Sequence, residues 1–178
     1  MSRIHIPSID TATGATAEIY AQIKKSIGGV PNTLAALGAL TPAGLKAFLN
    51  ADGVLGAGSL GKKDLETIRL AVSEIAGCDY CVAAHTAIGK LAGLAPETMK
   101  QVRSGQATGD AKRDALVHFV RHLVTTTGTI SQDAFDAIKA AGYTDQNLAE
   151  ISLAIGLMVV TNTFNRINDT VVDFPPAP

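Results

Sequence analysis

Residues 65–85 read LETIRLAVSEIAGCDYCVAAH, and this stretch decides the fold. Its first half places apolar side chains three or four residues apart, which is the period of an amphipathic α-helix. The members of this apolar stripe are Leu65, Ile68, Val72 and Ile75. Gly77 interrupts the pattern, because glycine readily adopts the backbone conformation that separates two helices. The stretch therefore predicts one helix over residues 62–76 and a second from Cys78 or Asp79 to about residue 91.

The composition predicts that the rest of the chain is helical too. Its 178 residues include 28 alanines but only 8 aromatic residues. Alanine is the best helix former, whereas strands favour aromatic residues. We predict one all-α domain over residues 1–178, a compact helical bundle in which residues 1–12 form an extended arm and residues 60–95 hold the helix pair of the reactive motif. The other predicted helices span residues 13–26, 31–38, 42–55, 96–103, 110–126, 131–142 and 144–170.

Charge and hydropathy exclude several classes of protein. Fifteen Lys and Arg against sixteen Asp and Glu give a net charge of −1, whereas nucleic-acid binders carry a basic excess or a basic stripe. The longest apolar run, about residues 151–160, is too short for a bilayer, which requires about 20 residues. The first residues lack the apolar core of a secretory signal. We therefore expect a cytoplasmic protein with no nucleic-acid or membrane partner. Its alanine-rich, weakly charged surface favours a homo-oligomer.

Both cysteines of the chain lie in the motif Cys78-Asp79-Tyr80-Cys81, and His85 follows four residues later. On a helix that begins at Cys78, the side chains of Cys78, Cys81 and His85 point from one face. The unpaired N–H groups at a helix start stabilise a thiolate and lower the pKa of a cysteine there. His85 is one turn beyond Cys81, within reach for proton exchange. In a reducing cytoplasm, such a dithiol favours redox chemistry or metal binding over a structural disulfide.

Two other interpretations use the same residues. In the first, the cysteines and the histidine are ordinary buried side chains of one helix. In the second, Cys78 and Cys81 bind zinc together with His118 and His122. However, 36 residues separate Cys81 from His118, far more than the dozen or so of a zinc finger. The two later histidines are better explained as the polar face of their own helix, so we predict no metal and no cofactor.

The residues around the dithiol resemble the alkylhydroperoxidase D / carboxymuconolactone decarboxylase family. The peroxidase branch of that family has a glutamate twelve residues before the first cysteine, then Cys-x-x-Cys and a histidine four residues later. The matching residues here are Glu66, Cys78, Cys81 and His85. Val30-Pro31-Asn32 and Asn165-Arg166-Ile167-Asn168 also resemble the peroxidase-related members. The resemblance covers most of the chain and is strongest over residues 60–95.

This resemblance implies an all-helical fold that assembles as a homotrimer or homohexamer, with the dithiol near the protomer interface. The implied activity, in antioxidant defence, is peroxide reduction, or disulfide reduction that serves a peroxiredoxin partner, with an external dithiol as reductant. Tyr80 departs from the best-known members, which have a second histidine at this position. A phenol with a pKa of about 10 cannot accept a proton near neutral pH as imidazole does.

The mechanism that we predict uses Glu66 to orient His85, which takes the proton from a cysteine. The thiolate attacks the peroxide and becomes a sulfenic acid, and the second cysteine then closes the Cys78–Cys81 disulfide. The position of His85 favours Cys81 as the attacking sulfur, whereas the helix start favours Cys78. The sequence does not choose between them.

Several residues keep a second interpretation. Glu66 can instead be an exposed carboxylate that pairs with Lys62, Lys63 or Arg69. Asn165 and Arg166 either line the site or form a polar cluster at a helix end. Two alternative functions stay open: a non-enzymatic redox sensor, and a carboxymuconolactone decarboxylase-type enzyme. The decarboxylase branch does not use this dithiol, so the intact motif counts against it.

Overall fold

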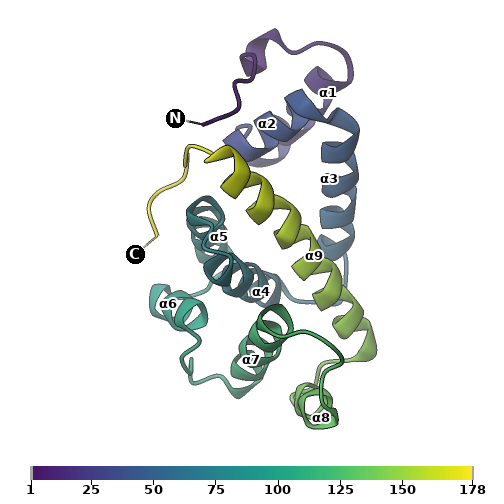
Figure 1. Ribbon diagram of the computed structural model, residues 1–178, viewed down its shortest axis with the longest axis vertical. Coiled ribbons are helices and arrows are strands. Elements are labelled where there is room, and N and C mark those ends of the chain that lie inside the picture. The colour runs from purple at the N-terminus through teal and green to yellow at the C-terminus, as the bar shows by residue number, and fades with distance from the viewer. Residues whose placement is uncertain (1, 178) are drawn as a thin grey trace.

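The computed structural model describes residues 2–177, and Figure 1 shows that they form a helical bundle. Within these residues the secondary structure is entirely helical, which confirms the all-α prediction. The helices are η1 (Ile9–Thr11, a 3-10 turn), α1 (Gly14–Ile27), α2 (Asn32–Leu40), α3 (Pro42–Gly56), α4 (Lys62–Ile75), α5 (Asp79–Leu91), α6 (Pro96–Ser104), α7 (Ala111–Thr125), α8 (Gln132–Ala140) and α9 (Asp145–Asn168).

The α-helices begin within one residue of their predicted starts, and side-chain caps explain the starts of α3 and α9. The Thr41 side chain accepts a hydrogen bond from the Gly44 N–H at the start of α3, where Pro42 is the first helical residue. Thr144 and Asn147 cap the start of α9 reciprocally, each side chain accepting from the other's backbone N–H. Residues at the start of each of these two helices therefore determine where the helix begins.

The core is organised around α4, which contacts α5, α6, α7 and α9. The predicted apolar stripe of α4 is buried there, and Ile68 has no exposed surface. Burying such a side chain contributes about 2 kcal/mol. Figure 1 shows α9 crossing the molecule diagonally, with α3 on one side and α4 and α5 on the other. Cys78 and Cys81 belong to the same core cluster, so the reactive motif lies inside the bundle.

The helix α9 has two contrasting faces. By length and composition it could cross a membrane, with a mean hydropathy of 1.3 over its most apolar window. The longest uninterrupted apolar run underestimates the hydropathy of this helix, because single polar residues interrupt the run without making the whole segment polar. One face contributes Ile151, Ala154 and Met158 to the core, as a core helix does. The opposite face leaves four large apolar side chains exposed: Leu153, Val159, Val160 and Ile167.

The two ends of the described chain meet beside the end of α9. The N–H of Arg3 donates to the carbonyl of Asn168 at 2.7 Å, and the N–H of Ile4 donates to the Asn168 side chain at 2.8 Å. The arm departs from the predicted extended course at η1, because the N–H and the hydroxyl of Thr11 both donate to the carbonyl of Ser8 and close a turn. The arm is therefore held at two points.

Candidate functional site

The reactive motif begins at the junction between α4 and α5. Gly77 has a left-handed backbone, with φ of 63°, which glycine adopts without steric cost. Its N–H donates to the carbonyl of Glu74 at 3.0 Å, and the N–H of Cys78 donates to the carbonyl of Ser73 at 3.1 Å. This pair of bonds is the Schellman arrangement that closes a helix. It leaves Cys78 as the N-cap residue of α5, the position that favours a thiolate.

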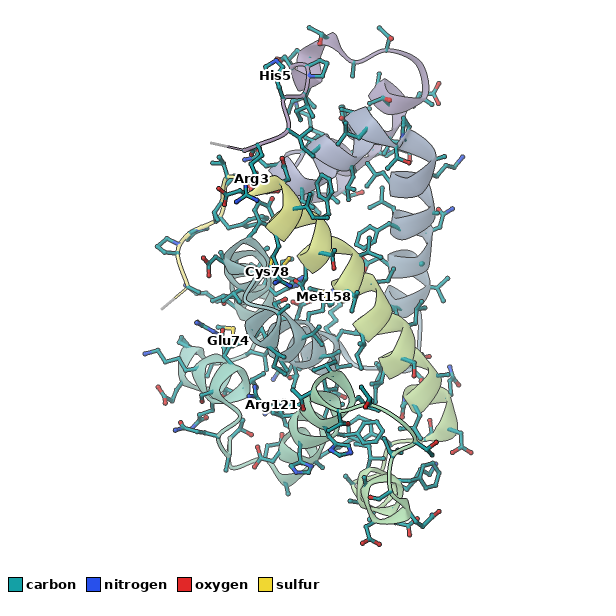
Figure 2. All side chains as sticks on the ribbon, viewed as in Figure 1. Arg3, His5, Glu74, Cys78, Arg121 and Met158 are labelled. Atoms are coloured by element: carbon teal, nitrogen blue, oxygen red, sulfur yellow. The ribbon has the colours of Figure 1, made fainter. Side chains whose placement is uncertain are left out.

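The two sulfurs share the first turn of α5. The Sγ of Cys78 accepts a hydrogen bond from the N–H of Cys81 at 3.4 Å, and the two thiol groups lie close enough to shift each other's pKa. Both cysteines are reduced, and only 2% of Cys78 and 3% of Cys81 is exposed. Figure 2 shows Cys78 in the interior, next to α9. The pair is therefore a buried dithiol whose sulfurs already contact each other.

Hydrogen bonding divides this pair into a thiolate and a thiol. Donation from the Cys81 thiol lowers the pKa of Cys78 to about 7, although burial opposes the shift, and the N–H of Cys81 adds to it. The same bond, together with burial, raises the pKa of Cys81 well above its ordinary range. Since the thiolate is the nucleophile, the structure favours Cys78 as the attacking sulfur.

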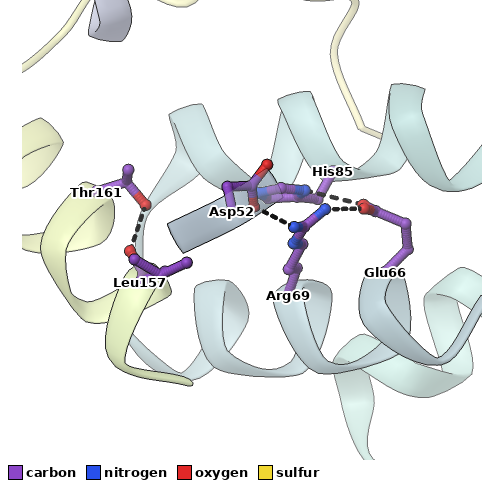
Figure 3. Close-up of polar contacts among 6 residues, drawn as sticks. All are labelled: Asp52, Glu66, Arg69, His85, Leu157 and Thr161. Carbon is purple, nitrogen blue, oxygen red and sulfur yellow. Dashed lines mark hydrogen bonds and ion pairs between the residues drawn. The ribbon is translucent and has the colours of Figure 1, made fainter. Parts of the chain in front are cut away.

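Buried Glu66 and half-buried His85 form a pair beside the dithiol. One carboxylate oxygen of Glu66 lies 2.9 Å from Nδ1 of His85, and the other accepts from Arg69 at 2.7 Å. Arg69 also pairs with Asp52 of α3, so the four side chains form a continuous chain (Figure 3). Burial alone would raise the pKa of Glu66, but His85 and Arg69 outweigh burial and hold it below its ordinary value. Glu66 is thus ionised.

The ionised carboxylate fixes the chemistry of the imidazole. An ionised Glu66 only accepts hydrogen bonds, so Nδ1 of His85 must carry the proton. In the neutral ring, Nε2 is then the base, one helical turn beyond Cys81. Among residues 2–177, no hydrogen bond joins His85 to either sulfur. The predicted pairing of Glu66 with Arg69 is present as well, but Glu66 is 2% exposed, so the expectation of an exposed carboxylate is wrong.

A second group of side chains approaches Cys81 from α9. The side-chain Nδ2 of Asn165 donates to the Sγ of Cys81 at 3.2 Å. The Oδ1 of the same amide accepts from the hydroxyl of Thr33 in α2 at 2.6 Å. Asn165 is buried, whereas Arg166 is exposed. Of the two residues that the sequence analysis considered together, only Asn165 therefore reaches the dithiol.

Tyr80 lies between the cysteines in sequence, but the partners of its hydroxyl do not belong to the proton relay. Its hydroxyl donates to Asp173 at 2.6 Å and accepts from the N–H of Thr33 at 3.3 Å. Its ring meets the edge of Phe174, with centroids 5.7 Å apart. Burial, followed by the bond to Asp173, raises the pKa of Tyr80 above its ordinary value. Tyr80 therefore stays neutral and anchors the C-terminal segment to the start of α5.

The remaining candidates lie outside this arrangement. Glu74 pairs with Arg103 of α6 at 2.7 Å rather than with His85. His118 and His122 belong to α7, and residues 2–177 contain no cluster of three or more His, Cys, Asp or Glu side chains that could hold a metal ion. The structure thus joins Glu66 to His85 and Cys78 to Cys81, and adds Asp52, Thr33 and Asp173, which no local sequence pattern indicated.

An open cavity lies on the Glu66 side of the site. Its volume is about 330 Å³, and its lining includes Glu66 and Arg69 beside the apolar Leu65, Ile88 and Leu91. Neither cysteine lines this cavity. The charged side of the site is therefore reachable from outside, whereas the sulfurs lie behind it.

With this geometry in view, the chain can be compared with known proteins. The model of the carboxymuconolactone decarboxylase family matches residues 42–121, which include Glu66, both cysteines and His85. No curated protein matches the chain in sequence.

Solved structures of similar fold cover nearly the whole chain. An uncharacterized peroxidase-related protein from Ralstonia eutropha, described as an alkylhydroperoxidase core, has a TM-score of 0.86 at 22% identity, over 97% of this chain and 92% of its own. A peroxidase-related protein from a Silicibacter species has a TM-score of 0.81 at 23% identity, over 96% and 91%. The debrominase Bmp8 in complex with 2,3,4-tribromopyrrole has a TM-score of 0.81 at 17% identity, over 97% and 94%. These likenesses concern the fold.

Proposed function

We propose that this chain is a thiol-dependent hydroperoxide reductase or disulfide reductase of antioxidant defence, because the carboxymuconolactone decarboxylase family model matches residues 42–121 and the fold is that of alkylhydroperoxidase D-like structures. The observation that carries this proposal is the dithiol. Cys78 has a pKa of about 7 and touches the thiol that would resolve it. The reaction needs no cofactor, because the two thiols supply both electrons.

The chemistry proceeds in two steps. The thiolate of Cys78 attacks the terminal oxygen of the hydroperoxide, the O–O bond breaks, and the departing alkoxide takes a proton, which leaves an alcohol and a sulfenic acid on Cys78. The sulfur of Cys81 then bonds to the sulfur of Cys78 and expels hydroxide, which takes the proton of Cys81 and leaves as water. An external dithiol reduces the resulting Cys78–Cys81 disulfide.

The proposed role of Glu66 and His85 is to move protons for these steps. Glu66 holds Nδ1 of His85 and leaves Nε2 free for the dithiol side. Because no hydrogen bond within the described chain links the imidazole to a sulfur, the proton travels through a bridging water or the substrate itself. A base positioned in this way typically contributes about 10²- to 10⁴-fold to the rate.

We also propose that the chain works as a homotrimer or homohexamer in the cytoplasm, with a small dithiol protein or a peroxiredoxin as redox partner. The support for an assembly is the exposed apolar face of α9, formed by Leu153, Val159, Val160 and Ile167. Light scattering on reduced and oxidised protein tests this assembly. A change of size on oxidation alone, without peroxide turnover, would favour a redox sensor instead.

Another candidate function uses the same dithiol on a different electrophile. One similar structure is described as a debrominase bound to a bromopyrrole. Reductive debromination also takes two electrons from a dithiol: a C–Br bond becomes C–H, bromide leaves and a disulfide forms. The family match equally accommodates a lactone decarboxylase. Unlike the other two activities, decarboxylation would survive in the double variant Cys78→Ser/Cys81→Ser.

The proposed function is tested by counting thiols. The protein is reduced, freed of reductant and mixed with one equivalent of an alkyl hydroperoxide, and free thiols are titrated over seconds. We expect both thiols to disappear as peroxide is consumed, with no crosslink between chains. The same titration with tribromopyrrole separates the two electrophiles. Two thiols still free after minutes would exclude the peroxidase.

A further inference from the structure

The amide of Asn165 has both of its ends engaged inside the protein. Its Nδ2 contacts the Sγ of Cys81 at 3.2 Å, and its Oδ1 accepts from the Thr33 hydroxyl at 2.6 Å. Only 4% of each of these two polar residues is exposed. This buried amide makes no hydrogen bond to Glu66 or His85, so it is separate from their proton relay.

Thr33 determines which end of the amide faces the sulfur. Because the Thr33 hydroxyl donates to Oδ1, the N–H group is the end that remains for Cys81. The reverse orientation would set a carbonyl oxygen against a sulfur that must become negative. The hydroxyl lies in the first turn of α2, while Tyr80 accepts from the backbone N–H of the same residue at 3.3 Å. The hydrogen bond from its backbone N–H to Tyr80 therefore holds Thr33 in place.

Cys81 is the thiol that most needs such a donor. It must lose its proton to close the disulfide, yet only 3% of it is exposed, so water cannot solvate the anion. Burial and the neighbouring Cys78 both raise its pKa, and among the groups that lower it the hydrogen bond from Asn165 is the largest. A hydrogen bond to a buried ionised group is among the strongest that a protein makes.

We propose that Asn165 is a catalytic residue that stabilises negative charge on Cys81 during disulfide closure, and that Thr33 is the positioning residue that keeps its N–H on the sulfur. This inference rests on the proposed function. In the step concerned, the Cys81 thiolate bonds to the sulfur of the Cys78 sulfenic acid, the S–O bond breaks, and hydroxide takes the proton that Cys81 gave up. No further oxidant or reductant enters.

The same contact acts in the reductive half of the cycle. An external dithiol attacks the sulfur of Cys78, a mixed disulfide forms, and Cys81 departs as a thiolate. A leaving group of lower pKa departs faster, so the N–H of Asn165 favours this step too. One amide therefore serves both the formation and the opening of the disulfide.

The first test needs no peroxide. In a Cys78→Ser background only Cys81 titrates as a thiol, and its thiolate is followed by absorbance at about 240 nm, a wavelength characteristic of thiolates. We expect Asn165→Leu to reduce the thiolate fraction at a fixed alkaline pH about tenfold, the value of one hydrogen bond to a charged group. Thr33→Val, which loses only the hydroxyl, should act in the same direction, and Thr33→Ser, which restores it, should recover the fraction of the Cys78→Ser parent.

The second test follows disulfide closure in otherwise unmodified protein. After one equivalent of hydroperoxide, the Cys78 sulfenic acid is trapped with a dimedone reagent and quantified by mass spectrometry. Asn165→Leu and Thr33→Val should accumulate trapped sulfenic acid, with closure slowed about tenfold or more. Thr33→Ser should close as the wild type does.

The outcomes separate the two proposals. If Cys81 titrates identically with and without Asn165, and Thr33→Val closes its disulfide at the wild-type rate, the inference is overturned whatever the activity. If the wild type consumes no peroxide, the proposed function fails, while the thiolate titration still decides the role of the amide. Thr33→Val serves if Asn165→Leu does not fold, because it changes one buried atom and little volume.

Discussion

The two sides of the dithiol are built from different chemistry. On one side, Asp52, Arg69, Glu66 and His85 form a chain of charged groups that ends at an open cavity. On the other side, Asn165 donates to Cys81 and accepts from Thr33, so that two neutral, buried hydrogen bonds lead to the sulfur. A charged chain can exchange protons, whereas an amide and a hydroxyl cannot near neutral pH. The charged side chains therefore move protons, whereas a separate group of neutral side chains orients the sulfur.

The pKa values follow the same division. His85 and Arg69 hold the pKa of Glu66 below its ordinary value against burial, so this carboxylate is charged over the working range of pH. Burial raises the pKa of Tyr80, which joins Thr33 on the neutral side. Between these two sides, the pKa of Cys78 is lowered to about 7. Cys78 of the dithiol therefore titrates near neutral pH, whereas Glu66 stays charged and Tyr80 stays neutral.

The largest effect is expected from Cys81→Ser, because Cys81 is where both sides meet. Without the second sulfur no intramolecular disulfide can form, so the variant should consume one equivalent of peroxide and stop. Trapping with dimedone should then find a stable sulfenic acid on Cys78. The matched variant Cys78→Ser should consume almost none, since it loses the thiolate. Continued turnover by Cys81→Ser in the absence of added thiol would contradict the proposed sequence of steps.

The charged side is tested by Glu66→Gln, which keeps the shape and removes the charge. We expect the rate of thiol oxidation to fall about 100-fold, the lower range for a lost acid–base contribution. The free energy of unfolding should fall by about 2 kcal/mol, because half-buried Arg69 and His85 lose an anionic partner while Arg69 keeps Asp52. Stopped-flow thiol titration and denaturant unfolding measure the two effects.

Glu74→Gln is the matched control for this prediction. Glu74 lies on the same helix but pairs with Arg103, and its side chain is 38% exposed. A partly exposed ion pair contributes at most about 1 kcal/mol, so the variant should oxidise its thiols at the wild-type rate. Equal rates for the two glutamine variants would remove Glu66 from the mechanism.

The sequence could predict the charged side but only part of the neutral side. Glu66 and His85 lie on two helices whose apolar periods are plain, and the family resemblance supplied their roles. Asn165 was noticed in a motif near the end of α9, but its partner Thr33 is 132 residues away in sequence. A threonine in the first turn of a helix has no pattern that signals such a contact, because only the packing of α2 against α9 creates it.

The same limit applies to residues whose partners lie in a distant segment of the chain. Asp173 lies 93 residues from Tyr80, in a segment without regular structure, so neither periodicity nor capping indicates the bond. An exposed Glu66 was the alternative interpretation, because a glutamate on a helix is usually exposed. Its burial becomes understandable only when Arg69 and His85 are both seen to neutralise it. Tertiary contacts, rather than local propensity, decided these cases.

An intermediate effect is expected from pH, and it sharpens the assignment of the titrating centre. The reactive form of Cys78 is the thiolate, and its pKa is lowered to about 7. The initial rate of peroxide consumption should therefore rise with pH through about 7 and level off above it, in parallel with absorbance at about 240 nm. In Cys78→Ser the absorbance step near 7 should vanish, because the thiol that produces it is gone and burial still raises the pKa of Cys81. A step that persists there would assign the low pKa to Cys81.

The smallest effect is expected from Asp173→Asn, which tests whether the neutral side is independent of the charged one. Asp173 accepts from Tyr80 and, through its other oxygen, from the N–H of Asn32 at 2.9 Å. Loss of its charge should lower the pKa of Tyr80, because the bond to the carboxylate raises it, yet burial, the larger cause, should keep it above the ordinary value. Phenolate absorbance measures this shift, and Tyr80→Phe identifies which of the three tyrosines contributes it.

The free energy of unfolding in Asp173→Asn should fall by only about 1 kcal/mol, since an amide oxygen can still accept from the phenol. Thiol oxidation should proceed at the wild-type rate, because Asp173 contacts neither sulfur and does not join the Glu66 chain. A loss of rate as large as that of Glu66→Gln would mean that the C-terminal segment controls the nucleophile. The separation of proton movement from sulfur orientation would then be wrong, because the charge of one carboxylate on the neutral side would govern both.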